Sequence, residues 1–268
     1  MWIARLGAMI VGTVSRFGEF TLFTLATIGA VVTGVPAWAK WSRFGTQLYL
    51  VGTRSVPVVG LTGAMIGAIL AVEGYDQFAA FGQEGRLGGV VNISIIKQIG
   101  PVLAAVMLAG RVGCSLAAEL GSMRVTDQID AMRAMAADPL RVLVAPRVVA
   151  CIVMIPVLTV ASNLCGVGGG WFVTTKLFGV NPEAYWDFTR VFIDWFDVMN
   201  GLVKSVFFGT AIGVISCYKG FRCRSGAQGV GRATTEAFVA SFVVIVIINL
   251  VLAKLLNDID ALRLGTRM

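Results

Sequence analysis

The chain has 268 residues, of which 57% are hydrophobic and 14% charged, and its formal net charge is +7. Soluble domains carry about 25% charged residues, so this composition excludes an ordinary soluble protein. The apolar runs are longer than the roughly ten-residue alternating segments of a membrane β-barrel, which leaves an all-α polytopic membrane protein. Because no Lys/Arg-rich block with interleaved aromatic residues is present, the positive charge indicates membrane topology and anionic lipid, not nucleic acid.

The N-terminal region, residues 1–45, admits two placements. Residues 20–39 carry no charge, and basic residues flank them on both sides: Arg5, Arg16, Lys40 and Arg43. Because positive charge stays in the cytosol, both flanks are expected there, and the region is predicted to be a membrane-embedded interfacial or re-entrant helix. A sixth span remains the alternative. No cleavable signal peptide is evident.

Five further segments are apolar over about the 20 residues that a membrane span needs. They cover residues 48–72, 87–110, 148–175, 198–218 and 237–253. Basic residues gather in loops 111–147 and 219–232 and acidic residues in the opposite loops, which places the N-terminus inside and the C-terminus outside. The whole chain, residues 1–268, is predicted to be one domain with a transmembrane core over residues 46–257.

Small and aromatic residues add weaker signals. Glycine pairs at GxxxG spacing let helices approach closely, either inside one subunit or at a dimer interface, and the sequence leaves both open. The pairs are Gly63/Gly67, Gly166/Gly170 and Gly209/Gly213. An aromatic cluster over residues 185–196 fits an interfacial belt on the outer side. The five cysteines form no CxxC pair and histidine is absent, so we expect no metal site.

A charged segment, residues 119–147, separates the second and third spans. At 100° per residue, Val125, Ile129, Met132 and Ala136 fall on one stripe of a helix predicted over residues 124–136. The Asp138-Pro139 pair predicts its end, because the residue before proline avoids the α region. Such a helix either lies on the membrane or its own subunit, or docks on a soluble partner, for which its methionines suit an irregular pocket.

The residues around this segment resemble a known family. The run GPVLAAVMLAGRVGCSLAAELGSMRVTDQIDAMRAMAADPLRVLVAPRVVA, residues 100–150, closely resembles the MlaE (YrbE) permeases of MCE-type ABC lipid transporters. The resemblance continues through KSVFFG at 204–209 and GVGRATTEAFVAS at 229–241, and it covers most of residues 48–255. The AGR-x-G…AELG-x-M…T-x-Q-I-D-A…DP-x-R…PR pattern is long and specific.

The resemblance implies a homodimer in the bacterial inner membrane, with an MlaF-like ABC ATPase on each subunit in the cytosol. It further implies an MlaD-like MCE-domain hexamer on the periplasmic side and an optional MlaB-like STAS-domain protein. The cargo is expected to be phospholipid, or a related hydrophobic lipid, moved between the inner membrane and the MCE conduit toward the outer envelope. The chain itself is expected to bind no cofactor, because ATP and Mg²⁺ belong to the ATPase.

By the same resemblance, residues 119–138 correspond to the coupling helix that sits on the ATPase. The candidate coupling residues are Glu119, Met123, Arg124, Asp127, Asp130, Met132, Arg133 and Met135. For Glu119 we expect a structural ion pair with Arg111 or Arg147, and contact with the ATPase is the alternative.

Four polar residues within the spans are candidates for the lipid cavity: Lys97, Gln98, Lys204 and Asn249. Lys97 precedes Arg111 by about 21 Å of helix and Lys204 precedes Lys219 by about 22 Å, so both lysines lie below the outer interface of a core about 30 Å thick. They either face a cavity that receives an anionic headgroup or snorkel outward. Relatives commonly carry acids at Gln98 and near Asn249, so an ion-pair mechanism is not carried over.

No enzymatic motif competes with the transport prediction. The chain lacks the GxxxxGK[ST] phosphate loop, HExxH and GxSxG, so a separate subunit must hydrolyse ATP and this chain is predicted to be a non-catalytic permease. The alternatives are an ion-coupled secondary transporter and a membrane-embedded lipid-modifying enzyme. The sequence indicates neither an internal repeat nor a buried acid for them.

Overall fold

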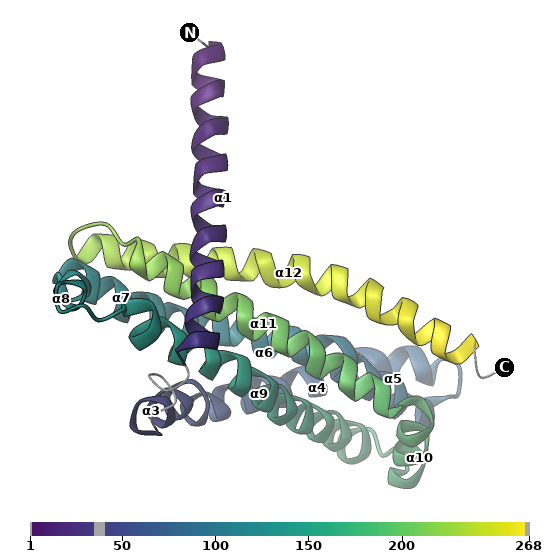
Figure 1. Cartoon of the computed structure of the whole chain (residues 1–268). Helices are drawn as coiled ribbons and strands as arrows, with labels where there is room; N and C mark the ends of the chain where they lie inside the picture. The colour runs from purple at the N-terminus through teal and green to yellow at the C-terminus, as the bar shows by residue number, and fades with distance from the viewer. Residues whose placement is uncertain (1, 35–40, 266–268) are drawn as a thin grey trace.

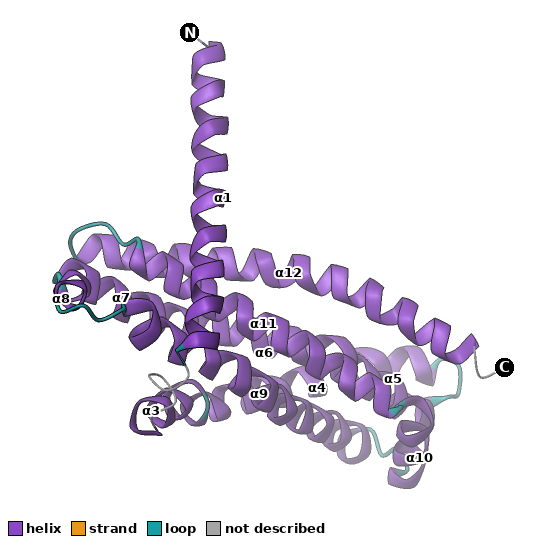
Figure 2. Ribbon diagram, viewed as in Figure 1, coloured by secondary structure: helices purple, strands orange, loops and turns teal. Residues whose placement is uncertain are grey.

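A computed structural model describes the backbone of residues 2–34 and 41–265, and within them the side chains of residues 11, 14, 15, 17–34 and 44–263. This part of the chain contains helices and no strand (Figure 2). The α-helices are α1 (Trp2–Thr33), α3 (Trp41–Val51), α4 (Val56–Ala79), α5 (Leu87–Ser94), α6 (Gly100–Leu108), α7 (Cys114–Val125), α8 (Gln128–Ala134), α9 (Ala145–Phe172), α10 (Pro182–Phe192), α11 (Trp195–Phe221) and α12 (Ala227–Gly265). Two 3₁₀ turns, η1 (Thr53–Ser55) and η2 (Glu84–Arg86), and four π-helical turns, η3 (Ile95–Ile99), η4 (Ala109–Gly113), η5 (Leu140–Val144) and η6 (Val173–Leu177), join them.

Five helical segments in the described residues are long and apolar enough to cross a membrane, as predicted. They cover Phe44–Ala79, Glu84–Val125, Leu140–Leu177, Trp195–Phe221 and Ala227–Arg263, and each extends beyond its predicted apolar run. The long helices lie roughly along one direction, with α8 at one end of the bundle and α10 and the C-terminus at the other (Figure 1). The chain is therefore an all-α polytopic membrane protein.

The first span differs from the prediction, which placed one helix over residues 48–72. The helix α3 ends at Val51 and α4 begins at Val56, after the turn η1. Pro57 stands in the first turn of α4, where its missing N–H is tolerated, whereas a continuous helix would lose that hydrogen bond. A Cβ on Gly52 would lie 1.9 Å from Met154 Cε, so this turn also runs closely against α9.

The predicted coupling helix over residues 119–138 is also wrong in its boundaries. Residues 119–125 continue the second span as the end of α7, and the separate helix α8 holds only seven residues, Gln128–Ala134. Asp127 (φ 55°) and Ala136 (φ 58°) both adopt left-handed backbone, which breaks the helix on each side of α8. Asp138 accepts a hydrogen bond from the Leu140 amide at 2.9 Å and thus starts the next helix.

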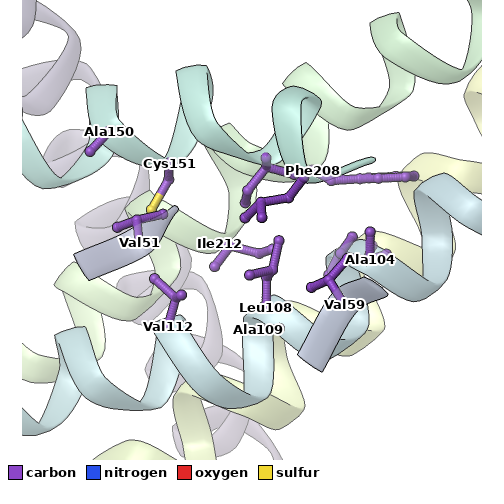
Figure 3. Close-up of a cluster of buried hydrophobic side chains, with 14 of the residues drawn as sticks. Val51, Val59, Ala104, Leu108, Ala109, Val112, Ala150, Cys151, Phe208 and Ile212 are labelled. Carbon is purple, nitrogen blue, oxygen red and sulfur yellow. The ribbon is translucent and has the colours of Figure 1, made fainter. Parts of the chain in front are cut away.

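The glycine pairs pack inside the subunit. A Cβ on Gly67 would lie 1.9 Å from the Gly166 carbonyl oxygen, and one on Gly63 would lie 2.5 Å from that of Ser162, so α4 and α9 meet backbone to backbone. Likewise, a Cβ on Gly209 would lie 2.8 Å from the Cys151 carbonyl oxygen, where α11 crosses α9. Beside these crossings, buried side chains from α4, α6, α9 and α11 form the main apolar core, including Leu108, Phe208 and Ile212 (Figure 3).

The helix α1 crosses the bundle steeply, and its N-terminal half projects away from it (Figure 1). Within the described side chains, its apolar stretch covers Phe17–Thr33. Phe20 and Phe23 make edge-on ring contacts with Tyr218, which fixes the C-terminal half of α1 to α11. The flanking Arg5, Arg16, Lys40 and Arg43 lie outside the described side chains, and the interfacial placement stays a prediction.

The predicted aromatic belt is only partly exposed. Trp186 and Trp195 face outward, but Tyr185 is fully buried at the contact between α10 and α5. Its hydroxyl donates to Asn92 Oδ1 at 3.0 Å, and Asn92 Nδ2 donates to Thr189 Oγ1 at 2.9 Å. Burial raises the pKa of Tyr185 to about 12, so its hydroxyl keeps the proton that this bond uses. The buried hydrogen bonds among Tyr185, Asn92 and Thr189 therefore attach α10 to α5. Only the outer face of α10 can belong to an interfacial aromatic belt.

Candidate functional site

The candidate coupling residues lie at the α8 end of the bundle. Among the predicted apolar stripe, Ile129 is fully buried, Val125 and Met132 are half-buried and Ala136 is exposed. The stripe therefore anchors α8 to its own subunit mainly through Ile129. Met135, in contrast, is 73% exposed and faces away from the subunit.

The charges of this region form a network across the break between α7 and α8. Asp130 accepts hydrogen bonds from Arg124 at 2.6 Å and from Arg133 at 3.2 Å. Asp127 lies three residues after Arg124, a spacing that brings side chains together on a helix, but it makes no ion pair within the described residues because its left-handed backbone interrupts the helix. All four side chains remain partly or largely exposed, and Met123 is half-buried beside them.

Glu119 forms the expected ion pair with Arg147, at 2.9 Å between Oε2 and Nη2. The Arg147 side chain is 6% exposed and that of Glu119 is 40% exposed. Arg147 Nε and Nη1 find no hydrogen-bond partner among the described residues, so Glu119 supplies the direct neutralisation of this buried guanidinium. The pair joins the end of the second span to the start of the third.

A second polar cluster lies toward the opposite end of the bundle, around the π-helical turn η3. Lys97 Nζ lies 3.1 Å from Asp197 Oδ1 and 3.6 Å from Asp260 Oδ2. Asp197 is buried in the first turn of α11, and Asp260 belongs to the last turns of α12. The ammonium group of Lys97 thus connects three elements that are far apart in sequence, and about a quarter of its side chain remains exposed.

Lys204 is enclosed within the subunit, with 1% of its surface exposed. Its ammonium group donates to Gln98 Oε1 at 2.7 Å and to the Lys97 carbonyl at 3.1 Å. That carbonyl lacks its ordinary helical donor, since the residue four positions later is Pro101, which has no N–H. Lys204 therefore compensates for the proline. A Cβ on Gly201 would lie 2.5 Å from the Ile96 carbonyl oxygen, so glycine is needed for this close approach.

The structure thus brings together Lys97, Gln98 and Lys204 but not Asn249. Asn249 is eleven residues before Asp260 on α12, about 16 Å along the helix axis. It is half-buried, and its Oδ1 has no partner in the described part of the chain. Neither of the two predicted placements of Lys204, facing a cavity or snorkelling outward, is observed within the subunit, because its side chain is buried and two of its three N–H donors bind Gln98 and the Lys97 carbonyl.

Sequence reasoning missed both acids of this cluster. Asp197 was assigned to an outer loop, and the expected absence of a buried acid is wrong because Asp197 is only 6% exposed. The signal was present: Asp194 and Asp197 have capping-box spacing ahead of an apolar run, and both capping hydrogen bonds form. The contacts of Lys97 with Asp260, and of Arg263 with Asp194 at 3.1 Å, join residues more than 60 positions apart and left no local pattern.

Comparison with known proteins fits this architecture. The family profile "Permease MlaE" matches residues 44–255. A probable ABC transporter permease protein of Rickettsia felis is 41% identical over 89% of this chain and 91% of its own length. The intermembrane phospholipid transport system permease protein MlaE of Haemophilus influenzae is 32% identical over 95% of this chain and 97% of its own length. The chain therefore belongs to the MlaE permease family and is a permease of the ABC transporter type.

Proposed function

We propose that the chain is the membrane subunit of an ABC transporter that moves phospholipid between the bacterial inner membrane and a periplasmic MCE-protein conduit. The likeness to the Haemophilus influenzae phospholipid permease over nearly the whole chain carries this proposal. The chain has no phosphate-binding loop, so ATP hydrolysis is assigned to a separate ATPase. A STAS-domain protein as a further partner is proposed on the family resemblance alone.

In this proposal, the two ends of the bundle bind different partners. The α8 end would face the cytosol and carry the ATPase, because its exposed Met135 and Arg133 offer an adaptable charged surface. The α10 end, with the C-terminus, would face the periplasm and the MCE ring (Figure 1). Along the most apolar stretch of α12, only 11% is buried inside the subunit. This exposed helix surface suits a second copy of the chain in a homodimer with lipid between the subunits.

Within the polar cluster, Lys97 is the proposed contact for an anionic headgroup. It retains exposed surface, and its 3.6 Å contact with the half-buried Asp260 is the longer of its two ion pairs. A phosphate oxygen could replace that carboxylate while Asp197 keeps the ammonium group in place. Lys204 and Gln98 are then assigned a supporting role, because their hydrogen bonds hold the backbone of η3.

The proposed ATPase docking is tested with the substitutions Met132→Trp and Arg133→Glu. In proteoliposomes with the ATPase, we expect either variant to lose most ATP-driven phospholipid transfer while its thermal unfolding midpoint stays unchanged. Arg190→Glu, on the exposed face of α10, is the matched control and should retain docking and ATP hydrolysis. Full ATPase binding and transfer by both α8 variants would refute the assignment, as would ATP hydrolysis by the purified chain alone.

A further inference from the structure

A cavity of about 340 Å³ lies at the α8 end, where α1, α8 and α11 meet. It is separate from the polar cluster around Lys97, and Met135 is not part of its lining. Three arginines line it, one from each neighbouring segment: Arg124 at the end of α7, Arg133 on α8 and Arg222 just after α11. The cavity therefore collects three basic groups, of which Arg133 also belongs to the proposed ATPase-docking surface.

The basic groups outnumber the acids that neutralise them. Arg124 and Arg133 share the single carboxylate of Asp130. Arg222 pairs with Glu19 of α1, and this hydrogen bond raises the pKa of the Arg222 guanidinium, which stays charged. Three guanidinium groups thus face two carboxylates, and each guanidinium has five N–H donors. The surplus positive charge and the spare donors are what an anionic phosphate group would bind.

The remaining wall of the cavity is apolar and continues into a lipid-facing surface. Phe23 and Phe221 line it, with ring centroids 5.8 Å apart, and Leu22 beside them is 68% exposed. Along α1, exposed apolar side chains continue away from the cavity on both sides, among them Phe17 and Leu25. Such a surface needs acyl chains around it. A ligand that fills this cavity must therefore join a negative headgroup to a hydrocarbon tail.

We infer that this cavity is a binding site for an anionic phospholipid of the leaflet next to α8. Its phosphate lies between Arg124 and Arg222, and an acyl chain follows Leu22 and Phe23 along α1. Because α1, α8 and α11 all contribute, the bound lipid would tie the N-terminal helix to the segment proposed for ATPase docking. The inference does not depend on the transport cargo and stands if the proposed function fails.

The test measures phospholipid binding to the purified, delipidated chain in a neutral detergent, through the rise of the thermal unfolding midpoint with added lipid. Phosphatidylglycerol should raise the midpoint, and phosphatidylcholine and free glycerol phosphate should not at equal concentration. Arg222→Gln and Arg124→Gln should each weaken phosphatidylglycerol binding about tenfold, the loss of one charge-assisted hydrogen bond. Arg232→Gln, an exposed arginine on α12 that lies outside the cavity, should leave binding unchanged.

Glu19→Gln separates a lipid site from a simple strap between α1 and α11. If the arginines bind lipid, removing the competing carboxylate frees Arg222 and should strengthen phosphatidylglycerol binding. If Arg222 only holds α1, Glu19→Gln and Arg222→Gln should act alike. The inference is overturned by that parallel behaviour, by equal shifts with both phospholipids, or by an equal response to free glycerol phosphate.

Discussion

The ion pairs at the two ends of the bundle differ in how deeply their side chains are buried. At the α8 end, Asp130 joins two arginines at a surface where all three side chains are 37% to 58% exposed. At the other end, Lys97 and Asp197 meet with side chains only 24% and 8% exposed. Exposed pairs contribute little to stability, whereas removing one partner of a buried pair is costly. The α8 end can thus change partners at little cost, while the Lys97 cluster fixes the positions of the spans.

The largest effect is expected for Asp197→Ala. The substitution removes the closer carboxylate of Lys97 and one of the two hydrogen bonds of the α11 capping box, and we expect it to lower the free energy of unfolding by about 3 kcal/mol. Denaturant or thermal unfolding in detergent measures this loss. A loss under 1 kcal/mol would mean that the two ends do not differ as the burial of their charges implies.

Glu119→Ala should lower the free energy of unfolding, because the α8 end also contains one partly buried ion pair, Glu119 with Arg147. It would leave the Arg147 guanidinium buried without its carboxylate, and we expect a loss of about 2 kcal/mol, reduced because Glu119 itself is 40% exposed. The double substitution Glu119→Ala, Arg147→Met should recover part of the loss, since it removes the uncompensated charge. Additive losses in this double-mutant cycle would show that the two side chains act independently.

Tyr185→Phe, at the α10 end, should lower the free energy of unfolding by less, about 1.5 kcal/mol. The reason is that Asn92 Oδ1 would lose its hydrogen-bond donor in a fully buried site. Proteolysis rates at the loops that flank α10 would report the same change locally, as faster cleavage. Trp186→Phe, on the exposed side of the same helix, is the matched control and should alter neither quantity.

Asp130→Asn should change the free energy of unfolding least, by no more than about 1 kcal/mol, because both arginine partners of Asp130 are exposed. The same variant should nevertheless weaken ATPase binding if the network orients α8. Unfolding and pull-down measurements on one preparation would test this contrast. A large loss of stability with normal ATPase binding would reverse the roles of the two ends.

The sequence was sufficient for the spans and for the position of the polar α8 region, because hydropathy and charge act over many residues. It did not predict that the helix breaks at Asp127, because helical periodicity carries no information about a single residue that adopts left-handed backbone. A local signal, Pro101, marked the Lys97 carbonyl as lacking its α-helical donor, but it did not identify Lys204, 107 positions from Lys97, as the replacement donor. The contact of Lys97 with Asp260 left no local signal, because it depends on how α12 packs against distant helices.

The assignment of the α8 end to the ATPase is tested most directly by photocrosslinking within the assembled transporter. Met135 on the α8 side and Val191 on α10 are similarly exposed, at 73% and 79%, and they lie at opposite ends of the bundle. A photoreactive residue at position 135 should crosslink to the ATPase subunit, and one at position 191 should not. Crosslinking to the ATPase from position 191, and none from position 135, would contradict the division of the molecule into a docking end and a cargo end.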